Sequence, residues 1–414
     1  MLIANPKATR QAYPEALRQI MSVEKANESR QWLSQWSRLN ASATPLYALP
    51  DLAAELGVAQ VLVKDESQRS VLGSFKALGA PIALVRLILR TFPEQHFSAR
   101  DLLEGKHADA LADFTVISAT DGNHGRALAA AAQSMGCRCN IVLHANVSVE
   151  REEAIAAYGA TIVRITGNYD ESVEEAAALA AANDWTVVSD TSYEGYEVIP
   201  RDVMQGYGTI SAEVIEALQA DAPVTHVFLQ GGVGGLAAGI ASYLWEQYGA
   251  QRPVFVMVEP AQADCLYQSA VQGRAAKATG SVDSVMAGLA CGETSPLAWR
   301  FLENSVDFFM TIEDDEAVAA MRRLAAGSTR DIPLVAGESG VAGLAGLMHV
   351  VGGKGLAADL GINADSRVLV VNTEGATAPG VYAGLLGESD VSVLRRQEAW
   401  LGALHTDKDF LAMR

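Results

Sequence analysis

The chain has 414 residues, of which half are hydrophobic, and a formal net charge of −18. This acidity excludes a basic surface for nucleic acid or for an anionic membrane. The length exceeds that of one small core and favours two domains or one large α/β unit.

The longest apolar stretch, residues 77–92, contains Arg86 and Arg90, so we expect no helix that spans a membrane. The first residues lack the hydrophobic segment of a signal peptide, which predicts a soluble, cytoplasmic protein. The four cysteines have no zinc-binding spacing, and no metal site is expected.

Short β-rich runs alternate with helical runs from residue 61 onward, which is typical of parallel sheets covered by helices on both faces. The sequence therefore predicts an α/β fold with open, mostly parallel, twisted sheets. We expect strands at 61–66, 114–120, 139–145, 160–166, 185–190, 225–230, 253–259 and 367–374.

The strands between about 115 and 190 form one series, and a second series starts at 225 after a proline-containing segment. We expect a large domain made of residues 1–85 and 223–414, and a small domain made of residues 86–222. Ligands of open α/β sheets bind where the carboxyl ends of strands meet. The site is therefore expected in the cleft between the two domains.

Lys76 follows a Gly-Ser-Phe turn and stands at the start of an apolar segment that we expect to be a helix. Gly73 allows a tight turn and Ser74 can cap the helix, so the direction of the lysine would be fixed. A fixed, partly desolvated lysine is a candidate nucleophile, whereas an ordinary surface lysine would extend its charge into water.

The segment SATDGNHGRALA, residues 118–129, follows a predicted strand and opens a helix. Gly122 and Gly125 allow close approach of the backbone to a ligand, and free amides at the start of a helix bind anions. Asp121, Asn123 and His124 provide more polar side chains than a simple helix cap needs.

The segment LQGGVGGLAAG, residues 229–239, also joins a strand to a helix. Gly232, Gly234 and Ala237 fit a dinucleotide fingerprint, with Glu259 as the acidic partner. The four glycines among residues 231–235 equally fit a cup for a phosphate group.

Two further predicted strands end in polar residues, one in Asp190 and the other in Thr373 and Glu374. Pyridoxal phosphate would use all of these loops, because it needs a lysine for its aldehyde, a cup for its phosphate and partners for its ring. Lys76, the glycines of residues 231–235, Asn123 and Thr373 supply these groups.

The motifs SFKALGA, DGNHG, GGVGG, GESGVAGL and NTEGAT resemble those of the fold-type II pyridoxal phosphate enzymes, the group of threonine dehydratase and the tryptophan synthase β-subunit. Within that group, LVKDESQR, SATDGNHGRALA, DTSYEGYEVIPRDVMQGY and MAGLACGE look like the diaminopropionate ammonia-lyases. The resemblance extends from about residue 44 to residue 380.

This resemblance implies roles for individual residues. Lys76 would hold the cofactor, and Lys76, Asp121 and Asp190 would be the catalytic groups. The remaining implied contacts are Phe75, Asn123, Gly231, Gly232, Val233, Gly234, Gly235, Glu338 and Thr373 with the cofactor, and Thr120, Asp121, His124 and Asp190 with the substrate.

The implied reaction is elimination of ammonia from 2,3-diaminopropionate, which yields pyruvate and a second ammonia. Three departures from the family pattern, at residues 69–76, at Tyr193 and at Ala378, affect the shape of the pocket. They leave a dehydratase of serine, threonine or another β-hydroxy amino acid as an alternative. An NAD(P)-binding oxidoreductase and a cofactor-holding paralogue without turnover also remain open.

The resemblance also points to a homodimer, the commonest oligomer. Cys265 and Cys291 lie in stretches that match the ammonia-lyase pattern, where loops near the cleft mouth are expected. If these loops pack together, a disulfide between the two cysteines could form on oxidation and stiffen the entrance.

Overall fold

The computed structural model describes residues 1–120, 122–218, 222–353 and 355–406. In these residues the strands form two sheets, one seven-stranded in the order β1-β10-β9-β8-β11-β3-β2 and one four-stranded in the order β6-β5-β4-β7. The strands are β1 (Leu2–Ala4), β2 (Leu46–Ala48), β3 (Gln60–Asp65), β4 (Thr115–Ala119), β5 (Arg138–Leu143), β6 (Thr161–Arg164), β7 (Thr186–Val187), β8 (His226–Gln230), β9 (Val254–Pro260), β10 (Phe308–Ile312) and β11 (Arg367–Asn372).

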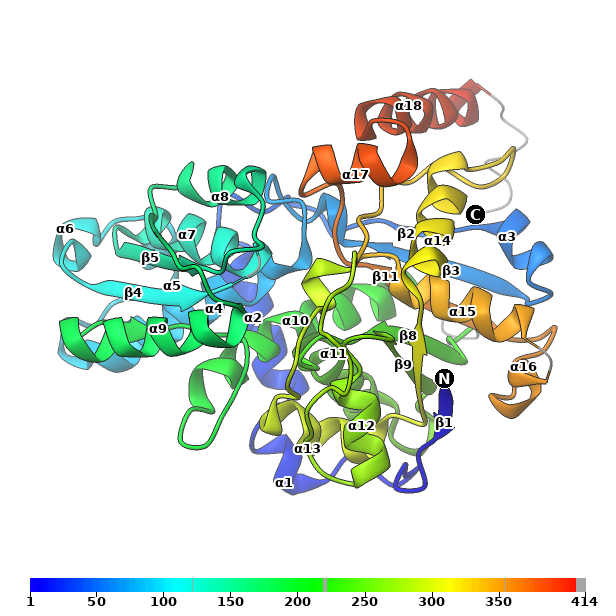
Figure 1. Ribbon diagram of the computed structural model, residues 1–414, viewed down its shortest axis with the longest axis horizontal. Helices are drawn as coiled ribbons and strands as arrows, with labels where there is room; N and C mark the ends of the chain where they lie inside the picture. Colours follow the sequence, from blue (N-terminus) through cyan, green and yellow to red (C-terminus); the bar gives the residue numbers. More distant parts are fainter. Residues whose placement is uncertain (121, 219–221, 354, 407–414) are drawn as a thin grey trace.

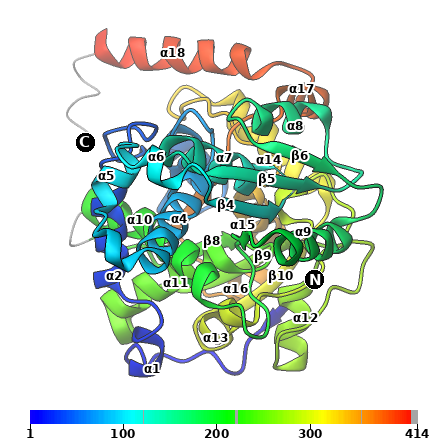
Figure 2. The ribbon, with the colours of Figure 1, turned by 90° about the vertical axis from the view of Figure 1, so that its left-hand side faces the viewer.

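Helices surround both sheets (Figures 1 and 2). The α-helices are α1 (Glu15–Arg18), α2 (Val23–Leu33), α3 (Pro50–Glu55), α4 (Ala80–Thr91), α5 (Ala99–Leu103), α6 (Ala108–Leu111), α7 (Asn123–Met135), α8 (Val149–Ala156), α9 (Tyr169–Asn183), α10 (Val198–Ala217), α11 (Gly235–Tyr248), α12 (Cys265–Gln272), α13 (Pro296–Ser305), α14 (Asp314–Ala326), α15 (Ala342–Gly352), α16 (Leu356–Asp359), α17 (Pro379–Leu386) and α18 (Asp390–Thr406). The short 3-10 helices are η1 (Glu66–Gln68), η2 (Phe75–Leu78), η3 (Pro93–Gln95), η4 (Gly249–Gln251) and η5 (Ala287–Leu289). Across the described part of the chain, none of the helices has the length and apolarity that crossing a bilayer requires.

The predicted α/β class is confirmed, and each predicted strand coincides with a strand of the structure. The four-stranded sheet is entirely parallel. In the seven-stranded sheet β3, β8, β9, β10 and β11 run parallel, whereas β1 and β2 pair antiparallel at the two edges. The sequence reading missed β10 and these two edge strands.

The five parallel strands of the large sheet are buried on both faces, which explains their nearly continuous apolar sequences. In β8, Val227 and Leu229 pack in the same hydrophobic cluster as α11, whereas Phe228, between them, packs with α15. Successive side chains of a strand point to opposite faces, so one short run of residues contributes to two layers of helices.

The small sheet is arranged in the same way (Figure 1). Val116 of β4 packs in one cluster with the alanines of α7, and Ile117 packs in another with Ala176 and Ala180 of α9. The strands of this sheet fall inside the expected small domain. The limits of the two domains stay a prediction.

Candidate active site

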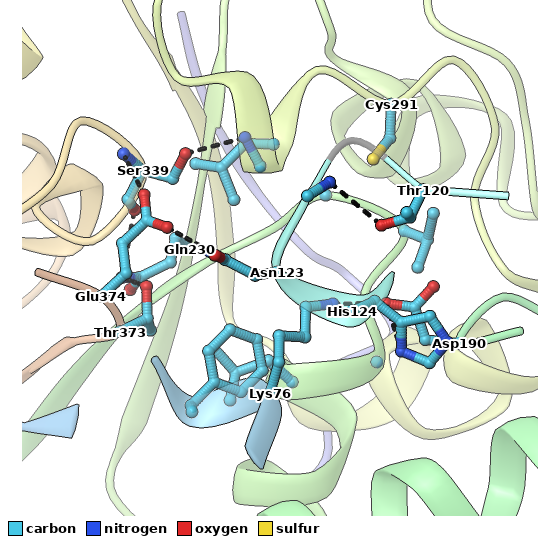
Figure 3. A pocket seen from close by; sticks show the side chains of 18 of the residues that line it. Lys76, Thr120, Asn123, His124, Asp190, Gln230, Cys291, Ser339, Thr373 and Glu374 are labelled. Carbon is cyan, nitrogen blue, oxygen red and sulfur yellow. Dashed lines mark hydrogen bonds and ion pairs between the residues drawn. The ribbon is translucent and has the colours of Figure 1, made fainter. Parts of the chain in front are cut away.

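A cavity of about 950 Å³, counted with its open mouth, lies where loops from the two sheets meet. Its wall includes Thr120, directly after β4, Gln230, the last residue of β8, and Thr373, directly after β11. These are the carboxyl ends of parallel strands, the expected position of a ligand in an open α/β sheet. Figure 3 shows the side chains that project into this cavity.

The turn that carries Lys76 is bonded to the end of β11. The amide of Phe75 donates to the carbonyl oxygen of Thr373 at 3.0 Å, and the amide of Gly375 donates to that of Gly73 at 2.9 Å. Gly73 has φ +69°, a left-handed conformation that favours glycine. Lys76 then lies in η2, so the expected helix begins as a 3-10 turn and continues as α4.

Lys76, Asp190 and His124 converge at one side of the cavity from η2, the loop after β7 and α7 (Figure 3). The Lys76 ammonium group forms an ion pair with Oδ2 of Asp190. His124 Nδ1 lies 3.9 Å from the same oxygen. His124 Nε2 lies 2.9 Å from the carbonyl oxygen of Val188, which holds the imidazole ring in place.

This ion pair determines the charges at the site. Burial favours the neutral form of Lys76, but the Asp190 carboxylate outweighs it and raises the pKa of Lys76 above its usual value. Burial likewise opposes ionisation of Asp190, yet the ammonium group of Lys76 holds the pKa of Asp190 well below its usual range. Burial lowers the pKa of His124, against the effect of Asp190. At neutral pH the site therefore holds a charged Lys76–Asp190 pair beside a neutral imidazole.

The start of α7 is fixed by Thr120. Its hydroxyl oxygen accepts hydrogen bonds from the amides of Gly122 at 3.1 Å and Gly125 at 3.2 Å. A Cβ atom on Gly125 would lie 2.4 Å from Cγ2 of Thr120, so this contact requires glycine. Asp121, a predicted catalytic residue between these positions, lies outside the described residues.

The side chain of Thr373 is positioned by a hydrogen bond from Gln230. The amide nitrogen of Gln230 donates to Oγ1 of Thr373 at 3.2 Å, and also to the carbonyl oxygens of Gly340 at 2.9 Å and Val371 at 2.8 Å. Gln230 was not predicted as a site residue. Its position as the polar end of an apolar strand is the sequence signal that could have identified it.

The glycine loop of residues 231–235 connects β8 to α11. Gly234 has φ +100°, and a Cβ atom there would lie 2.8 Å from Cδ1 of Leu302. A Cβ atom on Gly232 would lie 3.0 Å from Sγ of Cys291. The first amides of α11, a helix of 14 residues, have no carbonyl partner within the helix, and residues 232–235 line the cavity. The loop is therefore a backbone cradle for an anion.

Glu374 occupies the wall opposite Asp190 (Figure 3). The side-chain amide of Asn123 donates to Oε2 of Glu374, and the backbone amide of Ser339 donates to Oε1 of Glu374 at 3.3 Å. Glu338, next in sequence to Ser339, is 3% exposed and pairs with Arg151 of α8 at 2.6 Å. This ion pair joins a helix beside the small sheet to a loop of the large one.

Glu338 should make the stability of the protein depend on pH. Burial, together with the Glu374 carboxylate, raises the pKa of Glu338 to about 7, although Arg151 opposes the rise. A carboxyl group with a raised pKa stabilises the folded state fully below its ordinary pKa of 4.5, and this contribution is lost as the pH rises to about 7. Between about pH 5 and pH 7, this group should lower the free energy of unfolding of the wild type by roughly 2 kcal/mol. We expect this part of the pH dependence to be absent in Glu338→Gln.

Urea unfolding of the wild type and of Glu338→Gln at these two pH values measures this difference. Glu94→Gln, at an exposed position, is the control and should leave the pH dependence unchanged. An equal fall in the wild type and in Glu338→Gln would contradict the raised pKa.

Several residues that line the cavity were not expected from the sequence, among them Tyr169, Tyr207, Leu289 and Cys291. Tyr207 lies in the middle of α10, where its apolar neighbours indicate packing rather than chemistry. All four cysteines of the chain lie in the described part, and none of them forms a disulfide there. A bond between the buried Cys265 and Cys291 stays a prediction.

Comparison with known proteins identifies the class to which this fold and cavity belong. The profile of the family described as pyridoxal-phosphate dependent enzyme matches residues 38–374. The chain belongs to the family of pyridoxal-phosphate dependent enzymes. This membership confirms the predicted class and its cofactor, and it decides against a dinucleotide site at the glycine loop.

Within this family the chain is similar to diaminopropionate ammonia-lyases, as the sequence motifs predicted. The diaminopropionate ammonia-lyase of Escherichia coli K12 is 38% identical over 355 residues, which cover 84% of this chain and 88% of the relative. The holo crystal structure of the Escherichia coli enzyme has a TM-score of 0.85 at 36% identity and covers 93% of this chain and 96% of that chain. A structure of that enzyme with an aminoacrylate–pyridoxal phosphate azomethine reaction intermediate has a TM-score of 0.84 at the same identity and coverage.

The residues of the cavity fit pyridoxal phosphate. Lys76 offers an amine for the aldehyde, and the cradle of residues 232–235 leaves open the space that side chains would fill. His124 Nδ1 is buried and has no hydrogen-bond partner among the described residues. The cavity of about 950 Å³ is also within the size range of small-molecule sites.

Proposed function

We propose that this protein catalyses the pyridoxal phosphate-dependent α,β-elimination of 2,3-diaminopropionate. One molecule of water is consumed, and the products are pyruvate and two molecules of ammonia. The observation that carries the proposal is the Lys76–Asp190 ion pair in a cavity that also holds a glycine cradle. The similarity to diaminopropionate ammonia-lyases supports the choice of substrate.

In this proposal the cofactor is held by groups from four loops. Lys76 binds its aldehyde, and the amides of Gly232, Val233, Gly234 and Gly235 bind its phosphate. The amide of Gly231, predicted to share this role, instead donates to the carbonyl oxygen of Val258 at 2.9 Å. Phe75, Asn123, Glu338 and Thr373 surround the ring. When bound, pyridoxal phosphate withdraws electrons from Cα of an attached amino acid and makes its proton removable.

The acid–base groups of the chain then act on the substrate. Lys76 and Asp121 take the proton from Cα on opposite faces. Asp121 and Asp190 orient the amine on Cβ and relay the proton that it needs, because a neutral amine is a poor leaving group. Thr120 and His124, at the start of α7, bind the substrate carboxylate, where helix amides favour an anion.

Thr373 limits how long negative charge stays on Cα. Its hydroxyl group is neutral and already accepts a hydrogen bond from Gln230, so it does not enforce protonation of a ring nitrogen as a carboxylate would. Prompt loss of the β-amine is the expected consequence.

The stoichiometry of the products tests the proposed reaction. Purified enzyme with excess 2,3-diaminopropionate should release two molecules of ammonia for each pyruvate, with pyruvate measured by lactate dehydrogenase and ammonia by glutamate dehydrogenase. Absence of pyruvate, or a ratio of ammonia to pyruvate clearly below two, would refute the proposal.

We also propose that the enzyme is a homodimer in the cytoplasm, with a large domain of residues 1–85 and 223–414 and a small domain of residues 86–222. Family resemblance and the prevalence of dimers among oligomers support the first point. Light scattering coupled to size-exclusion chromatography measures the oligomeric state.

A further inference from the structure

Tyr207 is buried in the wall of the cavity, and its hydroxyl group makes no well-formed hydrogen bond. The residue is 1% exposed, and among the described residues the Lys76 amino group acts on the hydroxyl group as a side-chain hydrogen-bond partner. Buried tyrosines usually satisfy this group. A buried hydroxyl group without a well-formed hydrogen bond, at the border of the cavity, therefore points to a partner among the side chains of the site.

The neighbouring residues hold the ring of Tyr207 in a single position. Its ring lies 4.8 Å from that of Phe75, centroid to centroid. A Cβ atom on Gly79 would lie 2.7 Å from Cε1 of Tyr207, and one on Gly206 would lie 2.1 Å from the carbonyl oxygen of Leu78. The glycines let α10 approach η2 so closely that the ring is fixed beside the turn that carries Lys76.

Charged groups of the site act on this phenol from two sides. Burial raises the pKa of Tyr207, the Lys76 ammonium group opposes the rise, and the Asp190 carboxylate adds to it. Tyr207 therefore remains a neutral phenol at physiological pH.

We propose that Tyr207 is a positioning residue for Lys76. Its hydroxyl oxygen accepts a hydrogen bond from the Lys76 amino group whenever that group is not attached to the cofactor. Two of the three donors of the ammonium group are then satisfied, one by Asp190 and one by Tyr207. The amine is held toward the substrate between these two residues, instead of rotating about its flexible side chain.

This proposal rests on the proposed role of Lys76 in the reaction, but its main test needs neither cofactor nor substrate. In the full-length protein from which the cofactor has been removed, acetic anhydride labels lysines in proportion to their unprotonated fraction. Mass spectrometry compares Lys76 with the exposed Lys25 at about pH 9. Loss of a bond to the charged form lowers the pKa of an amine, so Tyr207→Phe should raise the labelling of Lys76 about 3- to 10-fold.

Tyr382→Phe is the matched control. Tyr382, in α17, is 0% exposed, and its hydroxyl group has no partner among the described residues, but it lies outside the cavity. This control should leave the labelling of Lys76 unchanged. In the holoenzyme, Tyr207→Phe should lower kcat about 10-fold and change KM less than about twofold, because positioning affects the reaction more than binding.

Unchanged labelling of Lys76 in Tyr207→Phe would overturn the proposal, as would an equal increase in Tyr382→Phe. Thermal unfolding shows whether each variant is folded. If Tyr207→Phe does not accumulate, Tyr207→Met also removes the hydroxyl group, and the labelling of Lys76 is measured in that variant instead. Failure of the ammonia stoichiometry with normal labelling would instead refute the proposed function alone.

Discussion

Replacement of Lys76 by alanine should lower kcat/KM for 2,3-diaminopropionate at least about 1,000-fold, because a covalent attachment point cannot be replaced by binding alone. Lys64, on the nearby strand β3, cannot substitute. It is 1% exposed, and its amino group pairs with Glu213 at 2.6 Å in a separate buried cluster. Steady-state assay of pyruvate formation measures the loss.

Borohydride reduction of the wild type followed by peptide mapping locates the attachment directly. The phosphopyridoxyl group should be found on Lys76, and its absorbance should be missing in Lys76→Ala. Lys25→Ala, at an exposed position, should keep both the label and the activity. A label on any other lysine of the wild type would refute the assignment.

Asp190→Asn should reduce kcat about 100-fold, the typical contribution of a positioned acid–base group. The substitution keeps the size of the side chain but removes the negative charge beside Lys76, whose side chain is only 20% exposed. Without this counter-charge, burial lowers the pKa of Lys76, and the relay to the β-amine loses its carboxylate.

The kinetic constants of Asp190→Asn should be compared with those of Asp113→Asn. Asp113 also forms an ion pair, with Arg138, but its side chain is 95% exposed, and its removal should leave kcat unchanged. A kcat for Asp190→Asn within about threefold of the wild type would exclude Asp190 from the reaction.

The parts of the fold that were predicted are those fixed by local pattern. Buried parallel strands are apolar throughout, so β4, β5, β8, β9 and β11 stand out in the sequence. β1 and β2 have three residues each and exist because they pair with β10 and β3, which no local pattern encodes. The predicted strand 185–190 shortens to Thr186–Val187, because the chain then leaves the sheet toward Asp190.

The candidate site, too, was predicted where local sequence patterns define it and missed where it depends on tertiary contacts. Glycines and polar side chains after apolar runs predicted the loops that the structure brings together, and Lys76, His124, Asp190 and Thr373 all line one cavity. The partners of these groups depend on tertiary packing. The Asn123–Glu374 contact joins residues 251 positions apart. Tyr207 is indistinguishable from a packing residue until the cavity beside it is known.

The central claim is that the cavity is built for a substrate with an amine on Cβ. The ratio of kcat/KM for 2,3-diaminopropionate to that for serine tests it most directly, since the two substrates differ only in the leaving group. The roles proposed for Asp121 and Asp190 at the β-amine predict a preference for the diamine of at least about 100-fold. An equal or greater kcat/KM for serine, or for threonine, would contradict the account and establish a dehydratase on the same scaffold.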